Sequence, residues 1–220
     1  KYKWQDCDSA VFHVSSDSRK KLAEVSLAWR LPRAPVEYMN TVQPAIYERF
    51  VNVLGYLAER RIRQDLERRN VPVAGLSYSH RSSASGSGDE RFTVNVSVPA
   101  EFAETAVGAI GRTFGSLDAA AVELDEYVIA RNHYLHELEG AVSESFKRNS
   151  DYVDRCISAF LYNASLASSK EKLDFHKSRQ LSDSTQFRLF QDMTKALVDD
   201  SRNLIFSCIT PDKKMTEEKV

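Results

Sequence analysis

A long amphipathic helix, predicted to run from Pro44 to Asn70, is the strongest constraint on how this chain folds. Its apolar side chains recur at three- and four-residue spacing and share one helical face: Ile46, Phe50, Val53, Leu54, Leu57, Ile62 and Leu66. Pro44 suits a first helical turn, whereas Asn70 and Pro72 end the helix. The helix therefore turns one face to a core and an arginine-rich face to solvent or to another domain.

Two strand patterns follow this helix directly, at residues 75–83 (GLSYSHRSS) and 91–98 (RFTVNVSV). In the second pattern, Phe92, Val94, Val96 and Val98 alternate strictly with polar residues, which is the period of a strand with one buried face. The polar stretch SSASGSGDE lies between the two patterns and is typical of a loop. An antiparallel hairpin is the simplest arrangement of these two strands.

The other elements are predicted from the same periodicities. Residues 11–32 hold a short strand signal and then a clear one, in which Val25, Leu27 and Trp29 alternate with small or polar residues. A helix is predicted from Pro99 and a second long helix from Ser116. The apolar stripe of that second helix is predicted to be Leu124, Val128, Leu135, Leu138 and Val142. Residues 151–199 indicate further helices, with breaks around 164–169 and 181–184, and residues 201–211 a last strand.

This order predicts an α+β fold, in which a mostly antiparallel sheet is covered on one face by long helices. The predicted division has three parts. Residues 1–21 are a lead-in from a preceding domain, residues 22–211 form a single α+β domain, and residues 212–220 are a polar tail.

The composition is that of a soluble globular protein. The 30 basic and 31 acidic residues give a formal net charge of -1, so no overall field favours nucleic acid or an anionic membrane. No apolar run is long enough to suggest a transmembrane helix, and the first residues lack the pattern of a signal peptide. The spacing of Cys7, Cys156 and Cys208 fits neither a disulfide framework nor a CxxC motif.

Several segments, in this order, resemble the domain that is repeated in the pitrilysin (insulinase) family of zinc metallopeptidases, the inverzincins. They are the strand AEVSLAWRLP, the helix end RRIRQDLERR, the Pro72 and Gly75-Leu-Ser-Tyr78 turn, the strand FTVNVSVP, and the helix start VELDEYVIAR. The resemblance covers residues 22–211. The spacing from Pro72 to Gly75 looks most like the second, non-catalytic domain of large bacterial members.

This resemblance implies the metallopeptidase (LuxS/pitrilysin-like) domain fold, paired with homologous domains into two halves that enclose a peptide. In the family, the catalytic domain binds zinc through His-x-x-Glu-His and a distant glutamate. The chain contains neither His-x-x-Glu-His nor His-Glu-x-x-His. We therefore assign no catalytic and no metal-ligating residue to it, and we expect the zinc in the catalytic domain of a parent protein.

The nearest approach to a metal site is His133, with His136 and Glu137 on the same predicted helix. The helical phase places His133 and Glu137 opposite the apolar stripe, with His136 at its flank. We expect these side chains to face solvent or a partner domain, without the enclosed support that a catalytic zinc requires.

Two further features invite a functional interpretation. The arginines Arg60, Arg61, Arg63, Arg68 and Arg69 could bind nucleic acid, but acidic residues interleave with them, so a solvated or domain-contacting face is favoured. Family members also hold the substrate with an arginine and a tyrosine after the equivalent helix. Arg68 and Tyr78 are the residues here that could contact a peptide, although their register is shifted and a structural role is favoured.

The resulting prediction is a non-catalytic domain of a zinc-dependent metalloendopeptidase. It would form part of the substrate chamber and dock to a catalytic domain in the same polypeptide or a partner subunit. Alone, it is expected to be inactive and free of zinc. One alternative is a catalytically dead scaffold of the processing-peptidase core type, and another is an unrelated hydrolase that uses His133, His136 and Glu137. The resemblance to bacterial proteins favours a periplasmic or cell-envelope location, with no membrane insertion and no nucleic acid as partner.

Overall fold

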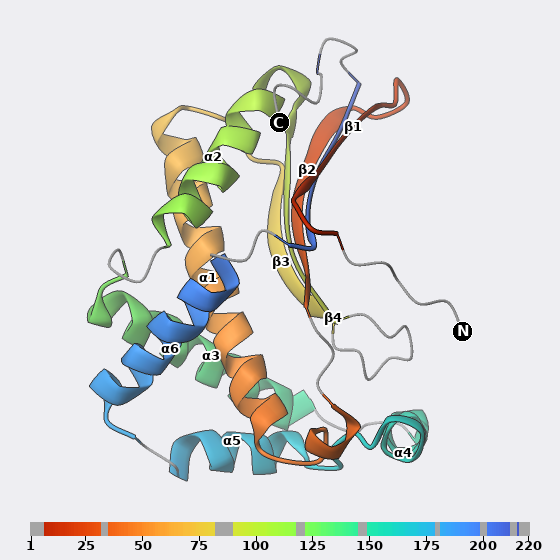
Figure 1. Cartoon of the computed structure of the whole chain (residues 1–220), viewed down its shortest axis with the longest axis vertical. Helices are drawn as coiled ribbons and strands as arrows, with labels where there is room; N and C mark the ends of the chain where they lie inside the picture. The colour runs from red at the N-terminus through yellow and green to blue at the C-terminus, as the bar shows by residue number, and fades with distance from the viewer. Residues whose placement is uncertain are drawn as a thin grey trace.

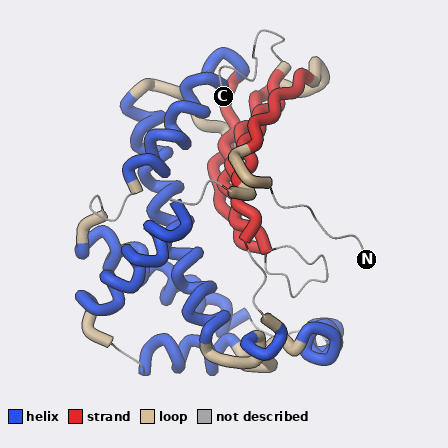
Figure 2. The backbone as a smooth tube through the Cα atoms, in the orientation of Figure 1, coloured by secondary structure: helices blue, strands red, loops and turns tan. Residues whose placement is uncertain are grey.

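The computed structural model describes residues 7–31, 35–81, 90–117, 122–144, 149–178, 181–198 and 202–211, together with Met215. A single sheet forms one layer, and the helices lie on one face of it and beyond one of its ends (Figures 1 and 2). The predicted α+β fold class is confirmed.

Among the described residues, the sheet has five strands in the order β1-β5-β2-β4-β3. Their bounds are Val11–Ser16 (β1), Leu22–Leu31 (β2), Gly75–Arg81 (β3), Glu90–Pro99 (β4) and Leu204–Thr210 (β5). Strands β1 and β5 are parallel, whereas the other three pairs are antiparallel. The predicted hairpin is the pair β3–β4. Strands β1 and β3 are the two edges of the sheet.

The alternation seen in the sequence decides which face of each strand is buried. In the central pair, Val25 lies opposite Val96 and Leu27 opposite Val94, and all four side chains are buried. On the other face, the hydroxyl groups of Ser26 in β2 and Ser207 in β5 form a hydrogen bond, with 2.7 Å between their oxygens. The face of small polar residues therefore points away from the helices, because burial of the apolar face is what lowers the free energy of the fold.

Helix α1 (Gln43–Arg68) follows the predicted helix closely and packs along β3, α2 and α3. Most of the predicted stripe is buried, but Ile46 is 38% exposed. Ile46 lies in the first turn of α1, which contributes to the wall of a cavity instead of the core. Asn70 ends the helix in a left-handed conformation with φ of 55°. That conformation lets the amides of Asn70 and Val71 bond to the carbonyls of Glu67 and Leu66.

A short 3-10 turn, η3 (Ala100–Phe102), leads from β4 into α2 (Ala103–Ser116), and α3 (Leu124–Glu144) follows. The prediction that a second long helix starts at Ser116 is wrong. Ser116 ends α2, and Leu117 and Val122 are both buried in the core. Helix α3 then begins at Leu124.

The predicted stripe of α3 is also partly wrong. The buried positions are Tyr127, Ala130, Tyr134 and Leu138, whereas Leu124 is 37% exposed and Val128, Leu135 and Val142 are half-buried. The contact face is rotated because tyrosine and alanine, which a purely aliphatic pattern passes over, meet the neighbouring helices. Ala130 permits close packing, and the ring of Tyr134 lies edge-on to that of His176.

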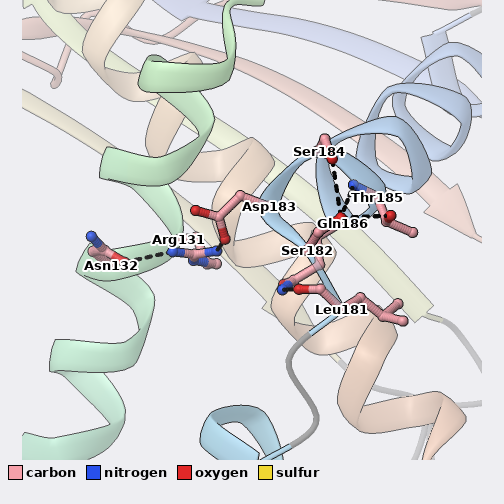
Figure 3. A network of polar contacts seen from close by, with 8 residues as sticks. All are labelled: Arg131, Asn132, Leu181, Ser182, Asp183, Ser184, Thr185 and Gln186. Atoms are coloured by element: carbon pink, nitrogen blue, oxygen red, sulfur yellow. Dashed lines mark hydrogen bonds and ion pairs between the residues drawn. The ribbon is translucent and has the colours of Figure 1, made fainter.

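The remaining helices are α4 (Asn149–Tyr162), α5 (Ser169–Ser178) and α6 (Asp183–Val198), which confirms the two predicted breaks. At the start of α6, the Ser182 hydroxyl accepts a hydrogen bond from the Thr185 amide at 3.3 Å. Arg131 of α3 pairs with Asp183, so the same turn is tied to α3 (Figure 3). None of the helices in the described parts of the chain is long and apolar enough to span a bilayer.

Residues 11–16 form the edge strand β1 of this sheet, and the ring of Phe12 stacks on that of Phe206 in β5. The turn before β5 also bonds to the start of the described chain, since the Cys7 amide donates to Asn203 Oδ1 at 2.8 Å. The division into residues 1–21, 22–211 and 212–220 remains a prediction, and residues 1–6, 212–214 and 216–220 lie outside the described part.

Candidate functional site

Strand β3 offers an open edge to a ligand. It pairs with β4 on one side, and no other described strand pairs with it on the second side. Its side chains Leu76, Tyr78 and His80 are half-buried toward the helices, whereas Ser77 and Ser79 are exposed on the opposite face. An open strand edge presents unpaired backbone amide and carbonyl groups, which an extended peptide can bind by adding a strand.

A cavity of about 1100 Å³ opens beside the end of this strand. Its walls come from the 3-10 turn η1 (Val36–Tyr38), the first turns of α1, residues 78–80 of β3, the loop after α4, and α5. The apolar part of the lining includes Tyr38, Val42, Ile46 and Phe175. A pocket of this size, mostly apolar with a few polar groups, is typical of a ligand site.

Three polar side chains form a cluster in the cavity wall: Tyr47, His80 and Glu90. His80 Nε2 and Glu90 Oε1 lie 2.8 Å apart, and their side chains are 10% and 8% exposed. The Tyr47 ring lies edge-on to the His80 ring, with centroids 5.8 Å apart. Burial, and secondarily the negative charge of Glu90, raise the pKa of Tyr47, so its hydroxyl stays protonated. The Tyr47–His80–Glu90 cluster can thus bind polar groups but contains no activated nucleophile.

This cluster was not predicted from the sequence, although the sequence held a signal for two of its members. Extending the buried alternation of β4 by two residues from Phe92 places Glu90 on the inward face. Extending β3 from Tyr78 places His80 on the same face. A charged residue in phase with buried apolar ones indicates a buried polar pair. Tyr47 could not be assigned, because only the packing of α1 against β3 brings it there.

Tyr78, one of the two predicted peptide contacts, packs mainly against α1. A Cβ atom added to Gly55 would lie only 2.2 Å from Cδ2 of the Tyr78 ring. Burial is the main cause that raises the pKa of Tyr78 to about 12, with nearby Glu137 and Glu59 adding to the effect. Tyr78 therefore fixes the distance between β3 and α1, and it also lines the cavity.

Arg68, the other predicted contact, is exposed in the last turn of α1. At about 1.5 Å of rise per residue, it lies roughly 20 Å along the helix axis from Gly55, where Tyr78 packs. The structure therefore does not bring Arg68 and Tyr78 together around one ligand group.

The two histidines of α3 do not converge on one point. His133 is only half-buried, and its ring stacks on that of Tyr56 at 4.2 Å between centroids. Its Nδ1 is 3.8 Å from Glu137, whereas exposed His136 is 3.6 Å from Glu139. Within the described ranges, no three His, Cys, Asp or Glu side chains are grouped to hold a metal ion. These residues do not fit the zinc site that the resemblance implies for a catalytic domain.

Several arginines of α1 are paired with carboxylates. Arg61 makes a two-pronged contact with Glu126 of α3, with a shortest distance of 2.7 Å. Arg63 and Arg69 pair with acidic residues one turn earlier on α1, at 3.0 and 3.2 Å. Paired guanidinium groups offer little free charge to phosphates, which supports the interpretation of this face as a solvated or domain-contacting surface.

Comparison with known proteins finds solved structures that share this fold. No known family profile and no curated sequence matches the chain. Solved structures do: the first half of the periplasmic protease PqqL from Escherichia coli has a TM-score of 0.68 at 15% identity. A peptidase M16 inactive domain from Pseudomonas fluorescens has a TM-score of 0.60 at 16% identity. A predicted insulinase family protease from Yersinia pestis has a TM-score of 0.63 at 13% identity.

These matches span almost the whole chain but less than half of the similar proteins. They cover 95–96% of this chain, and 43%, 46% and 43% of those three structures respectively. The chain therefore has the fold of a domain of the M16, or insulinase-family, peptidases, as the sequence resemblance implied. It corresponds to one portion of proteins that are more than twice as long.

Proposed function

We propose that the chain is a non-catalytic domain of an M16-type zinc metalloendopeptidase. It forms part of the wall of a substrate chamber and docks to a catalytic domain that carries the His-x-x-Glu-His zinc site. The observation that carries the proposal is a fold match over 95% of the chain, to part of a protease, in a sequence that lacks that motif. The similarity to a structure described as an M16 inactive domain supports the same assignment.

Within this proposal, an extended peptide binds along the open edge of β3. The backbone of the peptide adds a strand, and one of its side chains enters the cavity beside residues 78–80. The apolar rim residues Val42 and Ile46 contact that side chain, and the Tyr47–His80–Glu90 cluster bonds to its polar end. Binding energy gained here orients a peptide whose scissile bond lies in another domain.

Two properties of the parent protein belong to the proposal. The zinc is held by the catalytic domain, which is supported by the lack of His-x-x-Glu-His in this sequence and of any group of three His, Cys, Asp or Glu side chains able to hold a metal in the described ranges. The parent acts in the periplasm or cell envelope, a location supported by the similarity to the protease PqqL, which is described as periplasmic.

The first experiment measures zinc by elemental analysis and cleavage of fluorescein-labelled casein peptides by the purified chain. We expect no stoichiometric zinc and no chelator-sensitive cleavage. About one equivalent of zinc together with such cleavage would overturn the assignment as a non-catalytic domain.

The second experiment measures binding of the same peptides by fluorescence anisotropy and by amide hydrogen exchange. Bound peptide should slow exchange in residues 75–81 and leave β1 unchanged. The change Ile46→Asp should weaken binding at least about tenfold, because it places a charge on the apolar rim. The matched control is Leu189→Asp on α6, since Leu189 is 48% exposed and does not line the cavity. Equal affinity of both variants would refute binding in the cavity.

A further inference from the structure

Helix α4 turns its apolar side away from the rest of the protein. The exposed side chains on that side are Tyr152, Val153, Cys156, Ile157, Phe160 and Leu161. Of these side chains, Phe160 is 88% exposed. The half-buried side consists of Arg155, Ser158, Ala159 and Tyr162. This is the reverse of a surface helix, which normally buries its apolar stripe. We call the six exposed residues the α4 face.

Polar contacts join the inward side of α4 to the loop that follows the helix. The guanidinium of Arg155, on the inward side, donates to the backbone carbonyls of Leu166 and Ala167 in the loop after the helix. The Ala164 amide donates to the Ser158 carbonyl at 3.4 Å, which closes the end of the helix. Figure 1 shows α4 at the far end of the fold, apart from α1, α2 and α6. A rotation that buried Phe160 would break the Arg155 contacts.

The chemistry of the α4 face indicates a protein partner. A contiguous exposed patch with aromatic residues and no charge at its centre is typical of the core of a protein–protein interface. The charged residue Asp154 lies to one side of it, and Arg155 lies on the inward side of the helix. A membrane-surface helix would instead carry a row of basic residues beside the apolar one.

The length of the similar structures indicates which protein covers this face. They extend well beyond the portion that the chain matches, so a chain of this fold normally sits beside further protein. We infer that the α4 face is the docking surface for a neighbouring domain of the same polypeptide, which meets it with an apolar, uncharged surface. This inference rests on the proposed function and names the surface that does the docking.

The position of α4 connects docking to peptide binding. Ala164, Ser165 and Ala167, directly after α4, line the cavity. A domain seated on the α4 face would therefore lie beside the mouth of the cavity, and a peptide held along β3 would run between the two domains.

The test uses Cys156 as a reporter, because its thiol is exposed within the α4 face. The rate of maleimide labelling is measured by mass spectrometry of the intact protein. Two proteins are compared, the 220-residue chain and the complete product of its gene, and both carry Cys7→Ser. Buried Cys208 does not interfere. We expect labelling of Cys156 to be at least about tenfold slower in the gene product, because the docked domain covers it. As a control, Cys156→Ser is combined with Gln64→Cys, which places a thiol at an exposed position of α1. Labelling of this thiol reports the general reactivity of an exposed cysteine in both proteins.

A matched pair of variants shows whether the face itself is responsible. In the gene product, Phe160→Asp should restore fast labelling of Cys156, whereas Leu189→Asp on α6 should leave the protection in place. Protection that Phe160→Asp does not reduce would contradict the inference.

The remaining outcomes separate the alternatives. If Cys156 is labelled at the same rate in the 220-residue chain and in a gene product that has further domains, docking at the α4 face is refuted. Peptide binding and the proposed function are then left intact. A gene product without a further domain refutes both. If Cys156 is not protected from labelling in the gene product, two results for the 220-residue chain would assign the α4 face to another partner. Binding to phosphatidylcholine–phosphatidylglycerol vesicles that depends on Phe160 would assign it to a membrane, and self-association that depends on Phe160 would assign it to a second copy.

Discussion

The contact between Gly55 and Tyr78 sets how closely the edge strand β3 approaches α1, and it gives a sharp prediction. Gly55 is buried in the middle of α1. A Cβ at this position would lie 2.2, 2.5 and 2.6 Å from three carbon atoms of the Tyr78 ring. Carbon atoms pack at about 3.5–4.0 Å, so Gly55→Ala must displace the ring by more than about 1 Å.

Two opposing effects decide the magnitude. Alanine in a helix interior is favoured over glycine by about 1 kcal/mol. Overpacking costs about 1–3 kcal/mol, and a tyrosine ring that gives up roughly 80 Å² of buried surface loses about 2 kcal/mol more. The clash involves ring atoms close to the backbone of β3, which cannot swing aside as a flexible side-chain end would. Gly55→Ala should therefore lower the free energy of unfolding by about 2–4 kcal/mol, and it should weaken peptide binding at β3.

Urea unfolding followed by circular dichroism measures this change, with Gly111→Ala as the matched control. Gly111 is helical and has no heavy atom within 4 Å of the added Cβ, so its replacement should stabilise by up to about 1 kcal/mol. In a Tyr78→Ala background the clash is gone, and Gly55→Ala should then be neutral or stabilising, a reversal of sign characteristic of coupled residues. If Gly55→Ala stabilises the wild-type protein as Gly111→Ala does, the Tyr78 ring does not set how closely β3 approaches α1.

Three further predictions concern stability. Burial, and secondarily the charges of neighbouring basic side chains, lower the pKa of His176 to about 4. The unfolded chain binds a proton near pH 6.5 and the folded one only near pH 4, so acidification across this window should reduce the free energy of unfolding by up to about 3 kcal/mol. His176→Gln should remove that component from the measured pH dependence. Glu126→Gln should destabilise by about 1 kcal/mol, since it weakens the partly buried pair with Arg61, and added salt should affect the variant less than the wild type. Asn70→Ala should cost about 1 kcal/mol in thermal unfolding because φ is 55°, whereas Asn70→Gly should be close to neutral; equal effects would contradict the backbone argument.

Local periodicity accounts for the elements that the sequence predicted well. The strict alternation from Phe92 to Val98 and the long stripe of α1 each specify a secondary structure and its buried face together. The prediction for α3 was less accurate. Its buried face is built on Tyr127, Ala130 and Tyr134, residue types whose burial depends on their neighbours.

The candidate site was less accessible to the sequence than the fold. Tyr78 was identified as a strand residue, but its contact with Gly55 depends on two elements meeting at a distance that no local pattern encodes. His80 and Glu90 were in phase with buried residues, yet their pairing and the cavity beside them arise only when β3, α1 and α5 come together.

The sequence alone determined the type and bounds of most helices and strands, the α+β class, and the lack of a His-x-x-Glu-His motif, because these depend on residues close together in the chain. Only the tertiary structure decided that β1 pairs with β5, that Arg68 and Tyr78 are far apart, and that α4 turns Phe160 outward. Each of these is a matter of long-range packing. An amphipathic pattern shows that one face of α4 is apolar, but only the structure shows that the opposite face, on which Arg155 bonds to the Leu166 and Ala167 carbonyls, is the inward one.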